Sequence, residues 1–198
     1  MHYALFTIFV SYLYFNKNYI IQVEIKSIYR RAADNGLIFG AYLSVLFFMF
    51  VFSGKFFLIS LAGLILLLGI PGVIFVFLRR CFIAEYGKTT ISGLWMLGIL
   101  IFIYASLICG VVTYVYLQYF DPTFIYNQAQ AALDIYQSVE EIKGTDIVVG
   151  MQRAIEEKLL PTPIQFVFQM IWVTSFFGSL LSLLTALIVR VIPIKNAL

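Results

Sequence analysis

The chain has 198 residues, of which 62% are hydrophobic and 12% are charged. Soluble domains are roughly half apolar and about a quarter charged, so this composition excludes an ordinary soluble fold and indicates a membrane protein. The net charge of +3 is small, and in a membrane protein the placement of Lys and Arg matters more than their sum. We therefore expect no nucleic-acid partner.

The first apolar stretch, His2 to Phe15, is too short to cross a bilayer. As a helix it reaches about 20 Å, whereas the hydrocarbon core is roughly 30 Å thick. It lacks the basic start and the small-residue end of a signal peptide. An interfacial helix, a marginal fifth span and residues translated from an upstream start remain as alternatives. We assign residues 1–34 to a cytoplasmic N-terminal segment whose first part is peripheral or superfluous.

Residues 35–195 form a single membrane domain that begins with two closely spaced spans. Apolar stretches at about 35–52 and 56–78 are separated by a short polar turn, which predicts a tight antiparallel pair of spanning helices. Pro71 lies inside the second stretch and predicts a helix kink. A broken helix of the kind that builds transporter sites is the alternative, but Gly and Pro are common in membrane helices.

Two further spans are expected at about 91–120 and 164–189, the first of them after a polar loop from Arg79 to Thr90. Asp121 and Pro122 end the third span, because proline disfavours a helical conformation at the residue before it. None of the four predicted spans contains a charged side chain. Since ionisable groups inside the membrane usually mark ion and proton pathways, ion-coupled transport becomes a less favoured function.

The segment 121–163, between spans three and four, is predicted to be an acidic and helical insert. A first helix is expected from Phe124 to Lys143, with Gly144 as its C-terminal cap, and a second from Thr145 or Asp146 to about Leu160. One face of the first helix repeats apolar residues at spacings of three and four, which makes it a candidate partner face. This face comprises Ile125, Ala129, Ala132, Tyr136 and Val139.

Orientation follows from the basic residues on each side of the membrane. With the N-terminus inside, nine Lys and Arg residues are cytoplasmic and four are outside. We therefore expect both termini in the cytoplasm and the insert outside. The clusters at Lys26–Arg31 and Arg79–Lys88 are interpreted as topology determinants rather than as lipid-recognition sites.

Neutral polar residues in span four are the remaining candidates for a site. Gln165 and Gln169 are four apart on one helix face, and Thr174 and Ser175 follow. They suggest either a small polar lining or hydrogen bonds between helices, worth about 0.6 kcal/mol each on average, and we favour the second. Small residues also recur at four-residue spacing, for example Gly36 with Gly40. Packing within the chain is favoured over packing between two copies.

The chain lacks the residue patterns of catalytic and metal sites. His2 is the only histidine, which removes imidazole ligands and His-assisted nucleophiles. Cys81 lies beside two arginines whereas Cys109 lies deep in an apolar stretch, so we expect no disulfide between them. No phosphate-binding loop, nucleophile elbow or metal-ligand spacing occurs. We therefore predict no catalytic residue, no metal, no cofactor and no enzyme activity.

Short motifs along the chain resemble those of a known family. They are Tyr29 to Gly40 (YRRAADNGLIFG), Tyr86-Gly87-Lys88, Gly110 with Tyr114, Tyr116 and Tyr119, then Phe120-Asp121-Pro122, and Gly178-Ser179. Their order and spacing are similar to those of the bacterial membrane-protein family called domain of unknown function forty-one ninety-nine. The resemblance covers about Ile25 to Lys195. It implies a four-span inner-membrane protein of Gram-negative bacteria with an acidic extracytoplasmic insert, and it implies no activity or site residue.

These observations predict an all-α fold, an integral membrane four-helix bundle with an amphipathic helical extracytoplasmic insert between spans three and four. We expect a non-enzymatic accessory or scaffolding subunit of the bacterial inner membrane. The lipid bilayer surrounds it, and a membrane-protein partner or a second copy is a candidate contact. A small transporter or channel with a neutral polar lining is the alternative.

Overall fold

The computed structural model describes residues 28–54, 57–85, 87–138 and 145–192, and within these ranges it contains helices and turns but no strand. The predicted all-α fold is therefore confirmed. The N-terminal apolar stretch and the cap expected at Gly144 lie outside the described residues. The elements in chain order are α2 (Ile28–Ser53), α3 (Phe57–Ala84), α4 (Ile91–Val115), the π-helical turn η1 (Tyr116–Phe120), α5 (Phe124–Ser138), α6 (Asp146–Glu156) and α7 (Pro163–Val191).

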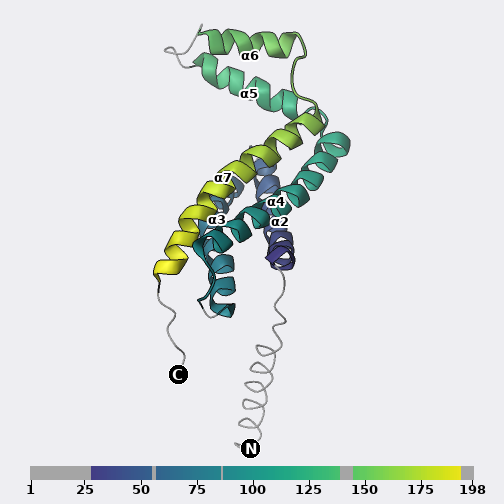
Figure 1. Ribbon diagram of the computed structural model, residues 1–198. Coiled ribbons are helices and arrows are strands. Elements are labelled where there is room, and N and C mark those ends of the chain that lie inside the picture. The colour runs from purple at the N-terminus through teal and green to yellow at the C-terminus, as the bar shows by residue number, and fades with distance from the viewer. Residues whose placement is uncertain (1–27, 55–56, 86, 139–144, 193–198) are drawn as a thin grey trace, which may run out of the picture.

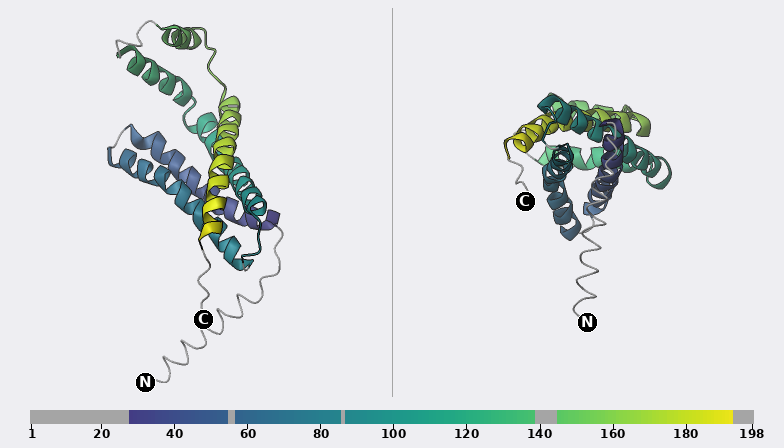
Figure 2. Two further views of the ribbon diagram at one scale, coloured as in Figure 1. Left: turned by 60° about the vertical axis from the view of Figure 1, so that its left-hand side comes forward. Right: turned by 60° about the horizontal axis from the view of Figure 1, so that its bottom comes forward.

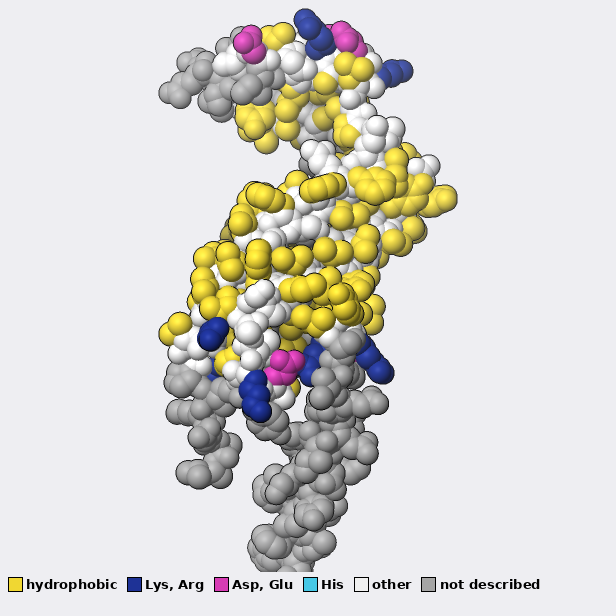
Figure 3. Space-filling view, viewed as in Figure 1, with side chains coloured by type: hydrophobic (Ala, Val, Ile, Leu, Met, Phe, Trp, Pro, Cys, Tyr) yellow, Lys and Arg dark blue, Asp and Glu magenta, His cyan; other side chains and the backbone are white. Residues whose placement is uncertain are grey.

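Four helical stretches are long and apolar enough to cross a membrane, namely α2, α3, α4 continued by η1, and α7. On the face seen in Figure 3, apolar side chains cover the middle of the molecule, and the charged side chains gather at its two ends. So large an exposed apolar surface is unfavourable in water and matches hydrocarbon. The chain is therefore a multi-pass membrane protein.

Two spanning helices are longer than predicted. α2 begins at Ile28, seven residues before the expected position 35, and α3 continues to Ala84. The loop predicted from Arg79 is therefore wrong over its first six residues, 79–84. Hydropathy marks only the part of a helix that crosses hydrocarbon, and the helix can continue into the interface, where charged side chains are solvated or find polar partners.

The second helix of the insert, α6, ends at Glu156 instead of about Leu160 because the chain forms a helix-terminating motif there. Lys158 has a φ of 55°, in the left-handed region that usually requires glycine. The Leu159 N–H donates to the Ala154 carbonyl at 2.9 Å, and the Lys158 N–H donates to the Ile155 carbonyl at 3.3 Å. This is the hydrogen-bond pattern of a Schellman motif.

α4 is the central helix of the bundle. Half of its most apolar stretch (50%) is buried, against 22% to 28% for the other three spans, and it packs most extensively against α2 and α7. Small residues allow the close approach of α2. A Cβ at Gly36 would lie 2.6 Å from Tyr104 Cβ, and one at Gly40 would lie 2.8 Å from Ile108 Cβ. Both distances are too short for a real side chain.

The contact between α4 and α7 uses small residues in the same way. Gly178 faces the ring of Phe102, and Gly98 faces the side chain of Ser182. A side chain at either glycine would push the two backbones apart. The small-residue stripes are therefore used for packing within this chain, as predicted.

The insert forms a helical hairpin beyond the ends of α4 and α7. α5 and α6 pack on each other, and they stand clear of the bundle, with α6 farther from it than α5 (Figures 1 and 2). Leu133 on α5 and Val148 on α6 are buried. Two insert helices between spans three and four were predicted, and both are present.

Candidate functional site

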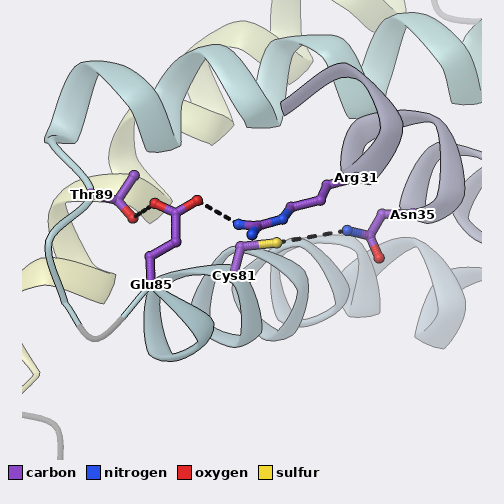
Figure 4. A network of polar contacts seen from close by, with 5 residues as sticks. All are labelled: Arg31, Asn35, Cys81, Glu85 and Thr89. Carbon is purple, nitrogen blue, oxygen red and sulfur yellow. Dashed lines mark hydrogen bonds and ion pairs between the residues drawn. The ribbon is translucent and has the colours of Figure 1, made fainter. Parts of the chain in front are cut away.

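A polar network joins three segments at the end of the bundle where the α3–α4 turn lies (Figure 4). Arg31 on α2 donates to the Glu85 carboxylate and forms an ion pair with it. The Thr89 hydroxyl donates to the other oxygen of the same carboxylate. Asn35, one turn along α2 from Arg31, donates from Nδ2 to the Cys81 thiol over 3.9 Å. The network thus links α2, the end of α3 and the turn before α4.

Arg79 makes a second connection at this end. Its Nη1 donates to the carbonyls of Val189 at 3.0 Å and Ile192 at 2.7 Å. These are carbonyls at the C-terminus of α7, which lack partners within the helix and carry its negative partial charge. The guanidinium also lies 5.8 Å from the centre of the Phe82 ring. Arg79 therefore caps α7 from α3.

These contacts fasten helix ends to one another. Arg31 joins α2 to the end of α3, and Arg79 joins α3 to the end of α7. The two basic clusters therefore also hold helices together, in addition to the role in topology expected from the sequence. Among the described residues no group of three or more His, Cys, Asp and Glu side chains could hold a metal ion. The two cysteines are free thiols, Cys81 half-buried and Cys109 buried, as expected from their different depths.

The opposite end of the bundle is built around the π-helical turn η1. The Asp121 N–H donates to the Tyr116 carbonyl at 3.0 Å, which closes the wider ring of a π-helix. Within this turn the Tyr116 and Phe120 rings stack, with centroids 6.2 Å apart and planes at 5°. Single π-turns of this kind are found often at functional sites.

Aromatic rings connect this turn with α2 and α5. Phe48 stacks on Phe52 at 6.5 Å and meets Tyr116 edge-on at 5.8 Å. Phe124, the first residue of α5, lies 6.1 Å from Tyr116. Edge-on and offset arrangements are the favourable geometries for aromatic pairs. The base of the insert is therefore attached to the bundle by ring contacts.

An apolar groove of about 460 Å³ lies against these rings, and its lining surface is almost entirely apolar. Its volume falls within the range of small-molecule sites, roughly 300–1,000 Å³. The groove is lined by Phe48 and Phe52 of α2, Val111, Val112 and Val115 of α4, and Tyr116 and Phe120 of η1.

The predicted polar lining is not gathered in this groove. Gln165 is exposed, and its Oε1 accepts a hydrogen bond from the Thr162 N–H at 2.9 Å, which completes a capping box at the start of α7. Gln169 is exposed, and Thr174 and Ser175 are half-buried. All four belong to α7, and none of them lines the apolar groove.

Pro71 is exposed within α3, which continues on both sides of it. The Tyr42 hydroxyl of α2 donates to the Leu66 carbonyl, in the turn before Pro71. Gly69 leaves room for this contact, because a Cβ there would lie 2.8 Å from the hydroxyl oxygen. The carbonyl that loses its helical partner at Pro71 is that of Leu67, four residues earlier, so the Tyr42 hydrogen bond fastens α2 to α3 and does not replace the bond that the proline removes.

The predicted partner face of α5 is only partly covered. Ile125, Ala129 and Ala132 are half-buried, and Tyr136 is 39% exposed. Val139 lies outside the described residues.

Sequence patterns did not find Glu85 or Phe48, because their importance comes from contacts between segments far apart in the chain. In the sequence, Glu85 is the single acidic residue of the otherwise basic segment from Arg79 to Thr90, and this contrast could have marked it as the partner of a basic side chain.

Comparison with known proteins identifies a family but no activity. The sequence model of the family described as "Protein of unknown function (DUF4199)" matches residues 34–191. No curated protein and no solved structure matches the chain significantly. The matched region contains all four spanning helices except the first turns of α2. The chain therefore belongs to the DUF4199 family.

Proposed function

We propose that this protein is a non-enzymatic accessory or scaffolding subunit of the bacterial inner membrane, and that it acts through its α5–α6 insert. The observation that carries the proposal is the position of this hairpin, which stands clear of the bundle (Figure 1). A helical pair that only closed the connection between two spans would need no exposed apolar side chains. A pair that binds another molecule needs such a surface.

The exposed surface of α5 fits this role. Ile135 is 64% exposed, Tyr126 is 45% exposed and Tyr136 is 39% exposed, although α5 packs against α6. Tyr is a common contact residue at protein interfaces because it offers a large apolar ring and a polar tip. The hairpin thus presents apolar and aromatic groups that remain exposed in the described part of the chain.

The basic-residue count supports a cytoplasmic position for both termini and an outside position for the insert. The polar network and the Arg79 cap lie at the end expected to be cytoplasmic. Positive charges there are favoured by the potential of the inner leaflet. A reporter fused after Leu198 should therefore read as cytoplasmic.

The test is native purification in mild detergent, followed by mass spectrometry of the intact complexes. The double variant Ile135→Ser/Tyr136→Ser should lose the associated partner or second copy that the unchanged chain retains. The matched control is Asp134→Asn, which changes the neighbouring exposed position on the same helix and should retain it. A strictly monomeric unchanged protein with no associated partner would count heavily against the proposal.

A small transporter or channel is the rival function. It was suggested by Gln165 and Gln169, but the capping hydrogen bond of Gln165 gives that residue a structural role. The rival predicts that the double variant Gln165→Leu/Gln169→Leu loses solute flux in liposomes. If the unchanged protein supports no flux, the rival is excluded for the solutes tested.

A further inference from the structure

We propose that the apolar groove between α2 and α4 binds one hydrocarbon chain of a membrane lipid. The groove lies within two of the spanning helices, so hydrocarbon surrounds it. It is formed by residues at the insert end of these helices and is separate from the polar network around Arg31. The proposal does not depend on the accessory role of the insert.

The groove is lined by aromatic rings, which form its wall, and by valines. Its wall is a continuous series of ring contacts, from Phe52 to Phe48, from Phe48 to Tyr116 and from Tyr116 to Phe120. The remaining lining is valine, at positions 111, 112 and 115. Valine has one branched carbon and few rotamers, so these side chains are stiff. A groove of fixed shape is favourable for binding, because little side-chain entropy is lost when it is filled.

The chemistry of the lining selects the ligand. Almost no polar surface faces the groove, so a polar ligand would lose its hydrogen bonds to water without replacement. Val111 and Phe120 remain 65% and 75% exposed at its edges, which leaves the groove open to the surrounding lipid. A hydrocarbon chain can enter from the side and gains close contact with rings and methyl groups.

The position of the groove sets the direction of the lipid. Val111, Val115 and Phe120 follow one another along the helix, and Phe120 is directly followed by Asp121, where the chain leaves the span. The head group of the lipid would therefore lie beside the turn into α5, at the membrane surface. Its chain would run along the valines towards the middle of the bilayer.

The test uses the full chain in vesicles of phosphatidylcholine that include phosphatidylcholine with a photoactivatable diazirine on one acyl chain. After irradiation, mass spectrometry of peptides locates the adducts. We expect adducts on 111–120 to exceed those on the exposed face of α3, which includes Ile65 and Leu68, by about tenfold, the ratio given by contact with roughly two additional methylene groups.

Two variants of opposite shape make the test specific. Val115→Phe fills the groove, and Phe120→Ala removes part of its wall at an exposed position, so both should reduce the adducts on 111–120 to the level of α3. Leu107→Phe is the matched control, because Leu107 is exposed one turn before Val111 and lies outside the groove. Unchanged far-ultraviolet circular dichroism shows that each variant is folded.

Equal labelling of 111–120 and α3 would overturn the proposal, since lipid would then meet the groove as it meets any other surface. It would also be overturned if Val115→Phe and Phe120→Ala lowered labelling no more than Leu107→Phe. Labelling of 111–120 that falls below that of α3 as the protein-to-lipid ratio is raised would show that a second copy fills the groove instead. Loss of partner binding by the α5 variants would leave this result unchanged, so the two proposals fail independently.

Discussion

The ion pair between Arg31 and Glu85 gives the sharpest prediction about stability. The Arg31 side chain is 12% exposed and the Glu85 side chain is 39% exposed, so the pair is partly buried. Removing one member of a fully buried pair costs about 3–5 kcal/mol, whereas an exposed pair contributes about 1 kcal/mol or less. In the Glu85→Ala variant Arg31 would stay mostly buried without its partner, which is costly. Solvent screening at the partly exposed Glu85 makes this cost smaller than for a fully buried pair, so we expect the free energy of unfolding to fall by about 2 kcal/mol.

The assay is unfolding by SDS in mixed micelles, followed by far-ultraviolet circular dichroism, with a double-mutant cycle. Arg31→Met keeps the apolar length of the side chain and removes its charge. In the double variant the loss should be smaller than the sum of the single losses by about 1–2 kcal/mol, because the second substitution leaves no unpaired partner. Arg80→Met, at an exposed position on the same end, is the control. The ion pair would contribute nothing to stability if the coupling energy were zero and Arg31→Met lowered the free energy of unfolding no more than Arg80→Met. That result would refute the prediction.

Three further predictions test other contacts of the bundle in the same unfolding assay. Gly36→Ala should destabilise by about 1–3 kcal/mol because its Cβ would overlap Tyr104, whereas Gly72→Ala, with open space around it inside α3, should not destabilise, since Ala is the better helix former. Gln165→Ala should cost about 1 kcal/mol through loss of the capping box, and Gln169→Ala should cost less; equal losses would contradict the capping role. Arg79→Met should cost about 1–3 kcal/mol and increase amide hydrogen exchange in the last turn of α7, and unchanged exchange there would contradict the cap.

The spanning helices could be predicted because their cause is local. A run of about 20 apolar residues is sufficient to cross hydrocarbon, and it needs no knowledge of the partners of each helix. The second insert helix also starts where it was expected, after Thr145, but the Thr145 hydroxyl makes no capping hydrogen bond with the described residues. The start of α2 was placed too late and the end of α3 too early, because charged residues at an interface do not terminate a helix. A helix ends where its backbone hydrogen bonds and its packing end. At the end of α6, for example, the backbone turns into the left-handed conformation at Lys158 and closes the helix with two hydrogen bonds.

The groove and the polar network could not be predicted because they depend on contacts across the chain. Phe48 and Tyr116 are 68 positions apart, and their rings meet along the α2–α4 contact that Gly36 and Gly40 keep close farther along the same helices. In the sequence both residues are ordinary members of apolar stretches. Gln165 shows the reverse case, since a polar residue that suggested a lining is used in a local cap. The sequence pattern identified Gln165 as a polar residue of interest, and the structure showed that it caps the start of α7.

The proposed function depends most on the insert and the basic end lying on opposite sides of the membrane, as the two charged ends of the molecule in Figure 3 suggest. Single cysteines introduced by Ser138→Cys and Lys88→Cys, in a background of Cys81→Ser and Cys109→Ala, report each side directly. In right-side-out vesicles a membrane-impermeant maleimide should label the first position and leave the second unlabelled until the membrane is opened. Labelling of both positions, or of the second position alone, before the membrane is opened would contradict the proposed orientation.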